Sequence, residues 1–253
     1  MLKVRVIPTM LHKGFGLVKG TQFDSRRAVG SPMQAVKVYN LRNVDELVFL
    51  DVSATAEGRG PDLDLIDDLA DDCFMPFAVG GGVSSIDDVR DLLSVGADKV
   101  VLGTAAIETP SIVREASDRF GAQCVVVSID TRRTGADDRA EVFVRSGTVA
   151  TGSDPVDVAR EMEALGAGEL LVQSIDRDGV MDGYDVDTVR RIADVVNVPV
   201  VASGGAGTFA DMAEVLSDGR ASAVAAAAMF HFTQQTPMEA KQYLAGHGFP
   251  VRV

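Results

Sequence analysis

Short apolar runs alternate with amphipathic stretches along the whole chain. The runs are continuous rather than alternating, which is typical of parallel strands buried on both faces. The predicted strands span residues 4–10, 46–52, 76–82, 99–105, 124–130, 169–176, 199–205 and 222–228. Helix-like segments lie between them, for example 31–43, 62–72, 84–96, 154–166 and 184–196. Several of these helices open at Ser or Asp and several end at Gly, as helix start and stop signals should.

Eight strands with intervening helices in 253 residues is the count expected of an α/β fold of the (β/α)8 TIM-barrel type. The rival, a doubly wound open sheet, usually has fewer strands and carries GxGxxG after its first strand, a motif absent here. We therefore predict a single barrel domain over residues 1–253. Residues 139–152 alternate instead and are punctuated by Gly, which predicts a small hairpin in the fifth βα loop.

The chain also contains an internal repeat. Residues 77–107 align with 200–230, which places Gly80-Gly81 on Gly204-Gly205, Asp87 on Asp211 and Ala97 on Ala221. A near-constant offset also sets Asp51 against Asp176 and Leu11 roughly against Asp130. A repeat of this length predicts two half-barrels related by a pseudo-twofold axis.

Composition narrows the classes of function. The net charge of -13 argues against nucleic acid or an anionic membrane as the main partner. No apolar run reaches the ~18 residues that span a bilayer, and the first residues lack signal-peptide regions, so we expect a cytoplasmic protein. Cys73 and Cys124 have no CxxC pattern and are interpreted as reduced core thiols. The histidines at 12, 231 and 247 lack ligand spacing, so we assign no metal and no cofactor.

Glycine clusters follow several predicted strands, at the end of a barrel where chemistry is found. Glycine lets the backbone approach a ligand, and the next helical turn points free N–H groups at it. One predicted cradle contains Gly80, Gly81, Gly82, Gly103 and Thr104; the other contains Gly204, Gly205, Ala227 and Ala228, beside Asp178 and Gly179. For a single cluster, tight barrel turns would be an equally good explanation. Two symmetric clusters predict a long ligand with a phosphate or similar anion at each end.

Acidic residues at strand ends are predicted to lie between the two cradles: Asp51, Asp130 and Asp176. Asp130 ends an apolar strand, and its carboxylate is a candidate general acid or base whose pKa depends on burial and neighbours. Its alternative role is to accept hydrogen bonds from loop N–H groups. Lys19, on the first βα loop, is a candidate to neutralise an anionic intermediate, the alternative being a solvated lysine.

Charged residues also stand near strand beginnings, at the opposite end of the predicted barrel. They are Arg5, Glu46, Lys99 and Glu169. Lysine and glutamate are rarely buried unless paired, so two positive and two negative charges could converge as a ring. From the residues alone, solvated strand ends are the simpler interpretation.

The sequence resembles the cyclase subunit of imidazole glycerol phosphate synthase, the HisF family, over essentially the whole chain. The resemblance rests on DELVFLDVSAT (45–55), VGGGVSS (79–85), GADKV (96–100), VVVSID (125–130), SIDRDGVMDGYD (174–185), ASGGAG (202–207) and FHF (230–232). It implies a (β/α)8 barrel paired with a glutaminase, whose ammonia passes along the barrel axis to a phosphorylated small molecule, a bisphosphate. It further implies an ammonia gate of salt-bridged charges at Arg5, Glu46, Lys99 and Glu169, with Asp98 facing the glutaminase.

The chain departs from the family at the reaction end. The family reaction uses two aspartates at pseudo-symmetric strand ends; Asp130 matches one, and Leu11 stands at the other, in MLHKGFG where the family reads much like LDVKDGR. A leucine cannot transfer a proton, so cyclisation should fall by a factor of ~100 or more. Ala78 stands where the family has a hydroxyl, Gly103 where Asn is common, and Gln173 where Thr is common.

The loop IPTMLHKGFGLVKG (7–20) is similar to a side branch of the family found in bacterial surface-polysaccharide clusters. Its members accompany a glutaminase and a separate sugar amidotransferase, and ammonia converts an N-acetyl group into an acetamidino group. The leading hypothesis is a lyase- or cyclase-type synthase subunit that docks and triggers a glutaminase as a 1:1 heterodimer and conducts ammonia. The alternatives are a working cyclase that makes imidazole glycerol phosphate and AICAR, the related sugar-phosphate isomerase, and a non-catalytic docking scaffold.

Overall fold

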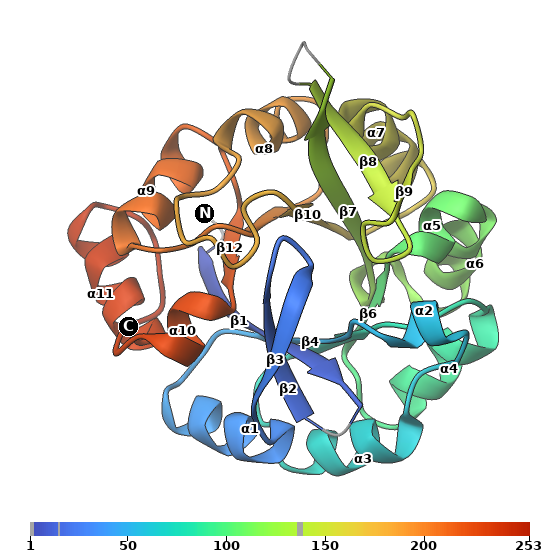
Figure 1. Cartoon of the computed structure of the whole chain (residues 1–253), viewed down its shortest axis with the longest axis horizontal. Helices are drawn as coiled ribbons and strands as arrows, with labels where there is room; N and C mark the ends of the chain where they lie inside the picture. Colours follow the sequence, from blue (N-terminus) through green and yellow to red (C-terminus); the bar gives the residue numbers. More distant parts are fainter. Residues whose placement is uncertain (1–2, 15, 136–138) are drawn as a thin grey trace.

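Eight parallel strands form a closed ring with helices around it (Figure 1), in a computed structural model that describes residues 3–14, 16–135 and 139–253. The ring contains β1 (Arg5–Lys13), β4 (Leu47–Asp51), β5 (Phe77–Gly80), β6 (Lys99–Leu102), β7 (Val125–Thr134), β10 (Glu169–Ser174), β11 (Val200–Ser203) and β12 (Ala223–Ala226). Each strand pairs in parallel with the next, and the β12–β1 and β7–β10 pairings close the ring. The predicted TIM barrel is confirmed, with every predicted strand in place.

Helices cover the outside of the ring and bury their apolar faces against it. The longer ones are α1 (Pro32–Leu41), α3 (Leu63–Asp71), α4 (Ile86–Ser94), α6 (Ser111–Phe120), α7 (Pro155–Ala164), α8 (Val186–Ala193), α9 (Phe209–Ser217) and α11 (Pro237–Gly246). Shorter turns are α2 (Ala54–Glu57), α5 (Thr104–Glu108), α10 (Ala228–Phe232) and the 3-10 turn η1 (Ala122–Cys124). In α3, Ile66 and Leu69 are buried while the aspartates face outward, as the sequence pattern predicts. Among the described residues, no helix is long and apolar enough to span a bilayer.

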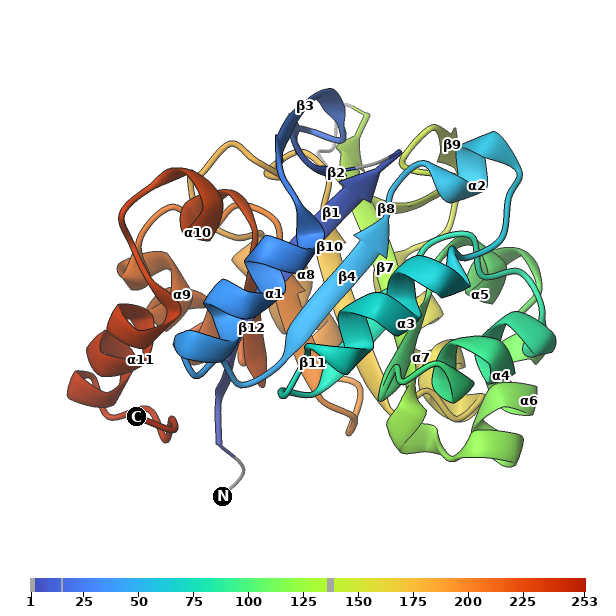
Figure 2. The same ribbon diagram turned by 90° about the horizontal axis from the view of Figure 1, so that it is seen from below.

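Two hairpins rise above the carboxyl ends of the strands (Figure 2). The predicted one consists of β8 (Arg139–Val144) and β9 (Val149–Ala150), and β8 also pairs with the extended end of β7. The other, β2 (Gly16–Thr21) and β3 (Asp24–Gly30), was missed because short, glycine-punctuated polar segments give a weak strand signal. It also lengthens β1 to Lys13, beyond the end expected near Leu11, by antiparallel pairing with β2.

The internal repeat is real, but its first part is shifted by one residue from the sequence alignment. Gly81-Gly82, rather than Gly80-Gly81, corresponds to Gly204-Gly205, because each pair follows a barrel strand with positive φ. The capping boxes agree, with Asp88 rather than Asp87 in the place of Asp211. The connection from α9 to β12 is one residue longer than the connection from α4 to β6. This extra residue restores the predicted alignment of Ala97 with Ala221.

The inside of the ring is a narrow apolar lumen. Its side chains form one buried cluster, namely Ile7, Val48, Ala78, Val101, Val126, Leu171, Val201, Ala223 and Ala225. Because strand side chains alternate, the next inward residues on each strand lie one layer above or below this cluster. The lower layer holds the charged residues described below, and the upper layer forms the floor of a cavity.

Candidate functional site

A cavity of about 450 Å³ opens at the carboxyl ends of the barrel strands. Both predicted cradles line it from opposite sides of the ring: Gly81, Gly82, Gly103 and Thr104 from the β5 and β6 side, and Asp178, Gly179, Gly204, Gly205, Ala227 and Ala228 from the β10 to β12 side. Gly80 ends β5 and is not among the lining residues. The cavity therefore has the two-sided form that the repeat predicts.

The cradle glycines serve two different purposes. Gly81 and Gly204 have positive φ, and a Cβ on either would collide with the backbone of the preceding strand end, at Asp51 and Ser174. These two glycines are therefore required by the barrel turns themselves. A Cβ at Gly103 would meet nothing within 4 Å. This position is open to the cavity, so the glycine leaves room for a ligand.

Leu11 and Asp130 occupy equivalent positions in the two half-barrels. Leu11 pairs with Leu50 of β4, and Asp130 pairs with Gln173 of β10, while Leu50 and Gln173 each pair with the end of the following strand. Leu11 and Asp130 both line the cavity. The predicted opposition of a leucine and a carboxylate is thus a feature of the site.

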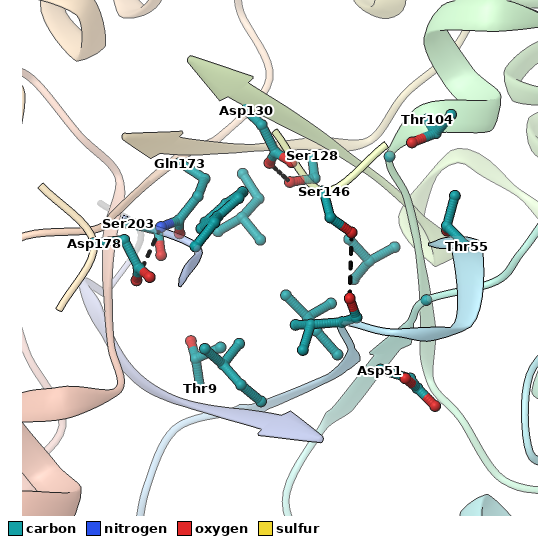
Figure 3. A pocket seen from close by; sticks show the side chains of 18 of the residues that line it. Thr9, Asp51, Thr55, Thr104, Ser128, Asp130, Ser146, Gln173, Asp178 and Ser203 are labelled. Carbon is teal, nitrogen blue, oxygen red and sulfur yellow. Dashed lines mark hydrogen bonds between the residues drawn. The ribbon is translucent and has the colours of Figure 1, made fainter. Parts of the chain in front are cut away.

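Asp130 lies within β7 rather than at its end, with its carboxyl group in the cavity wall (Figure 3). The Ser128 hydroxyl donates a hydrogen bond of 2.9 Å to its Oδ1. Burial raises the pKa of Asp130 to about 6; the Ser128 hydrogen bond opposes that rise, and the charge of Asp178 adds to it. A carboxyl group with a pKa near neutrality is suited to both accepting and donating a proton.

We expect Ser128→Ala to raise the pKa of Asp130 further, because the ionised carboxylate loses its hydrogen-bond donor. Asp178→Asn should lower that pKa, because a like charge is removed. The measurement is a pH titration of the side-chain carboxyl carbon by 13C NMR, with the Asp130→Asn spectrum to assign the signal. Equal pKa values in the wild type and Ser128→Ala would contradict the described geometry.

The other predicted acids and Lys19 have surroundings different from those of Asp130. Asp51 lines the cavity, but its Oδ1 accepts from the backbone N–H groups of Ser53 (3.0 Å) and Ala54 (3.1 Å), and Arg59 Nη2 lies 2.7 Å from its Oδ2. Burial would raise the pKa of Asp51, but the bonds from Ser53 and Arg59 outweigh it and lower the pKa. This carboxylate therefore holds the start of α2.

The expectation that Asp176 lies between the cradles is wrong. It accepts a 2.7 Å bond from the backbone N–H of Arg133 and is not a cavity residue, because it follows the end of β10 by two positions. It does not correspond to Asp51 either, since Leu50 and Gln173 are the equivalent strand ends. Lys19 lies in β2 opposite Arg27 and is not among the residues that line the cavity.

Polar residues that sequence reasoning overlooked form the cavity floor. They are Thr9, Ser128 and Ser203, beside Gln173, whose amide lies 3.4 Å from Asp178 Oδ1 (Figure 3). Strand alternation gives the signal that could have found them, because Thr9 and Ser128 precede Leu11 and Asp130 by two residues and share their inward face.

A ring of four charges closes the opposite end of the lumen. Arg5 Nη1 lies 2.5 Å from Glu46 Oε2, and Arg5 Nη2 also pairs with Glu169; Lys99 Nζ lies 2.8 Å from Glu46 Oε1 and 2.7 Å from Glu169 Oε2. Burial would raise the pKa of Glu169, but Arg5 and Lys99 together hold it below its ordinary value. The simpler interpretation of solvated strand ends is therefore wrong for these four residues.

Asp98 lies at the same end of the barrel as the ring. Its side chain is exposed, and its Oδ2 accepts a 2.8 Å bond from the backbone N–H of Phe77 at the start of β5. In the part of the chain that the structure describes, no three His, Cys, Asp or Glu side chains are grouped as they would be to hold a metal ion. Phe15, within the loop pattern, lies outside the described residues.

A family model described as "Histidine biosynthesis protein" matches residues 5–236, which includes every barrel strand and both cradles. The chain belongs to the histidine biosynthesis protein family. Enzymes of the histidine biosynthesis protein family are isomerases and cyclases built on this barrel, so the match supports a HisA- or HisF-like enzyme. The cavity at the strand ends lies where such barrels carry out their chemistry.

Proposed function

We propose that this protein is the barrel subunit of a glutaminase-dependent complex, which receives ammonia at its charged lower end and delivers it to a phosphorylated ligand at the upper end. The observation that carries the proposal is the combination of an intact charge ring with a mouth in which Leu11 faces Asp130. Buried charges below an apolar lumen are costly to desolvate, and the passage of a polar molecule such as ammonia through the ring gives a reason for keeping them.

The lower end also has features of a docking surface. Leu41, the last residue of α1, is 88 % exposed, and Phe74, which precedes β5, is 84 % exposed. Both residues lie on the face of the barrel that carries the ring. Asn40 ties the two segments together by bonding to the backbone of Asp72 (2.5 Å) and Phe74 (3.1 Å). Large exposed apolar side chains held in place in this way are typical anchors of protein interfaces.

The residues that line the cavity favour a product other than that of histidine biosynthesis. Leu11 removes one of two expected acid/base groups, and Gly103 replaces a larger polar side chain in the same cavity, whereas Ala78 lies below it in the apolar lumen. Residues of both cradles line the cavity, and Gly103 leaves space there for an anionic ligand. We therefore assign the chain to the acetamidino-sugar side branch, with amide-to-amidine chemistry completed by a separate sugar amidotransferase.

A second candidate is the cyclase of histidine biosynthesis itself. Asp130, with a pKa of about 6, favours it, because Asp178 lies close enough to influence that pKa and offers a second carboxyl group in the same cavity. A docking scaffold without chemistry of its own would need the lower end of the barrel, but it would not need a buried Asp130 with a raised pKa. Turnover by the wild-type chain, measured beside Leu11→Asp, separates the working cyclase from the other candidates.

The test of the proposed function is activation of a glutaminase. The purified chain is mixed with each amidotransferase-type glutaminase subunit of the same genome, and glutamine hydrolysis and complex mass are measured. We expect a 1:1 heterodimer and at least a tenfold rise in hydrolysis, lost with Phe74→Ser, which changes only an exposed side chain. A chain that stays monomeric and activates none of them at micromolar concentration would contradict the proposal.

A further inference from the structure

One strand, β1, follows the whole axial path of the barrel. Its inward side chains are Arg5 in the charge ring, Ile7 in the lumen, then Thr9 and Leu11 in the cavity lining. Thr9 therefore stands where the apolar lumen opens into the cavity. Figure 3 shows it across the cavity from Asp130 and Ser128.

The Thr9 hydroxyl is a buried polar group without a partner in the described part of the chain. The residue is 5 % exposed, and its Oγ1 makes no hydrogen bond. Its backbone carbonyl, by contrast, lies 3.2 Å from His231 Nε2. Buried hydroxyl groups are nearly always hydrogen-bonded, and a valine would fill this strand position without the penalty. A hydroxyl in this state, directed into a cavity, is suited to a ligand.

We propose that Thr9 binds ammonia at the exit of the lumen, an inference that rests on the proposed function for the source of the ammonia. The hydroxyl can accept an N–H from ammonia or donate to its lone pair. Unlike the aspartate expected at position 11, it cannot protonate ammonia and so leaves the nucleophile neutral. Asp130 lies on the far wall, where its Oδ1 accepts a hydrogen bond from the Ser128 hydroxyl.

Binding of ammonia can be followed without turnover or a partner. Threonine, isoleucine and leucine methyl groups are labelled with 13C, and NMR spectra are recorded as ammonium chloride is added close to the pKa of ammonium, with potassium chloride as the matched control. We expect a saturable shift of the Thr9 methyl signal, identified by its absence in Thr9→Val. With Leu11 as reporter, Thr9→Val should weaken binding about tenfold, while Thr9→Ser keeps it within about threefold.

Thermal unfolding of the same variants tests the hydroxyl's role in the fold. If it has no structural partner, Thr9→Val should unfold at the wild-type temperature or about 2 °C higher. A fall of several degrees in Thr9→Val that Thr9→Ser restores would overturn the inference, because the hydroxyl would then support the fold. Two NMR results would also overturn the inference. One is a shift of the Thr9 methyl signal equal to that in potassium chloride, which would indicate only an effect of salt or a displaced water. The other is equal binding of ammonia by Thr9→Val and the wild type.

These outcomes are separate from the test of the proposed function, because no glutaminase is present. If the protein activates no glutaminase but the Thr9 signal shows a saturable response, the proposed partner is contradicted and the ammonia site is supported. Activation without a Thr9 response would leave the partner and remove the ammonia site.

Discussion

Leu11→Asp should raise ammonia-dependent turnover of the cyclase family's bisphosphate substrate by about 100-fold or more over the wild-type chain, which we expect to be nearly silent. General acid/base groups contribute factors of about 10² to 10⁴, and the substitution restores the group missing from one half-barrel. The register places this carboxyl group at the position equivalent to Asp130, within the same cavity. The measurement is substrate consumption with ammonium salts as the nitrogen source.

Two variants control for shape and for the surviving acid. Leu11→Asn has nearly the size of the aspartate but cannot ionise, so it should show no gain. Asp130→Asn in the Leu11→Asp background should remove the gain, because both carboxyl groups are needed. Because the reaction would use both carboxyl groups, the pH dependence of the active variant should be described by two apparent pKa values.

The outcome also decides between the candidate functions. A silent wild type and an active Leu11→Asp mean that the cradles and Asp130 still function and that Leu11 alone blocks cyclisation. Turnover by the wild type at a rate equal to that of Leu11→Asp would show that Leu11 is no obstacle, and the protein would be an ordinary cyclase. If neither form turns over the substrate although both unfold at the normal temperature, the protein has diverged in the ligand that it binds.

Most of the barrel could be predicted from the sequence because each strand is a continuous apolar run with a strong signal. The opposition of Leu11 and Asp130 followed from the repeat and is confirmed by the strand register. The charge ring could not be derived from the residues alone, because whether Lys99 is solvated or paired depends on contacts with Glu46 and Glu169, far away in sequence. Here the family resemblance provided what local pattern could not.

The three errors have different physical causes. The β2–β3 hairpin is built from short polar segments, whose pairing is fixed by the extension of β1 rather than by their own composition. The expectation that Asp176 lies at the cavity assumes that it is equivalent to Asp51. The strand pairing instead places the equivalent of Asp51 two residues earlier in the chain than Asp176. Thr9 was overlooked because it is unremarkable in sequence and becomes distinctive only when burial shows that its hydroxyl lacks a partner.

Lys99→Met should lower the free energy of unfolding at pH 7 by about 3 kcal/mol, because removing one partner of a buried ion pair leaves an uncompensated charge. The Glu46 and Glu169 side chains are only 4 % and 7 % exposed, and in the variant both would depend on Arg5 alone. The measurement is urea unfolding. Lys99→Arg, which keeps the charge, should lose much less.

The loss should shrink as the pH falls. The pKa of Glu169 is held below its ordinary value of 4.5, so its ionisation contributes stability above that pH, and the contribution disappears as the pH falls through the folded-state pKa. In Lys99→Met the pKa of Glu169 rises, and protonation relieves the unpaired charge. The difference between wild type and variant should therefore be largest near pH 7 and should shrink as the pH falls toward the lowered pKa of Glu169 in the wild type. A loss below about 1 kcal/mol that does not change with pH would indicate a solvated ion pair.

Stability alone does not explain why the ring exists, because a buried ion network can often be exchanged for apolar residues of similar volume without loss. Replacing Lys99 with Met and Glu46 with Gln together should cost less than the sum of the single changes, as expected for coupled partners. The same double variant should lose most of the glutaminase activation predicted for the wild type, because a partner would meet an altered charge pattern at the entrance of the lumen. Retained activation with restored stability would mean that the ring only closes the barrel, and the route of ammonia would have to be sought elsewhere.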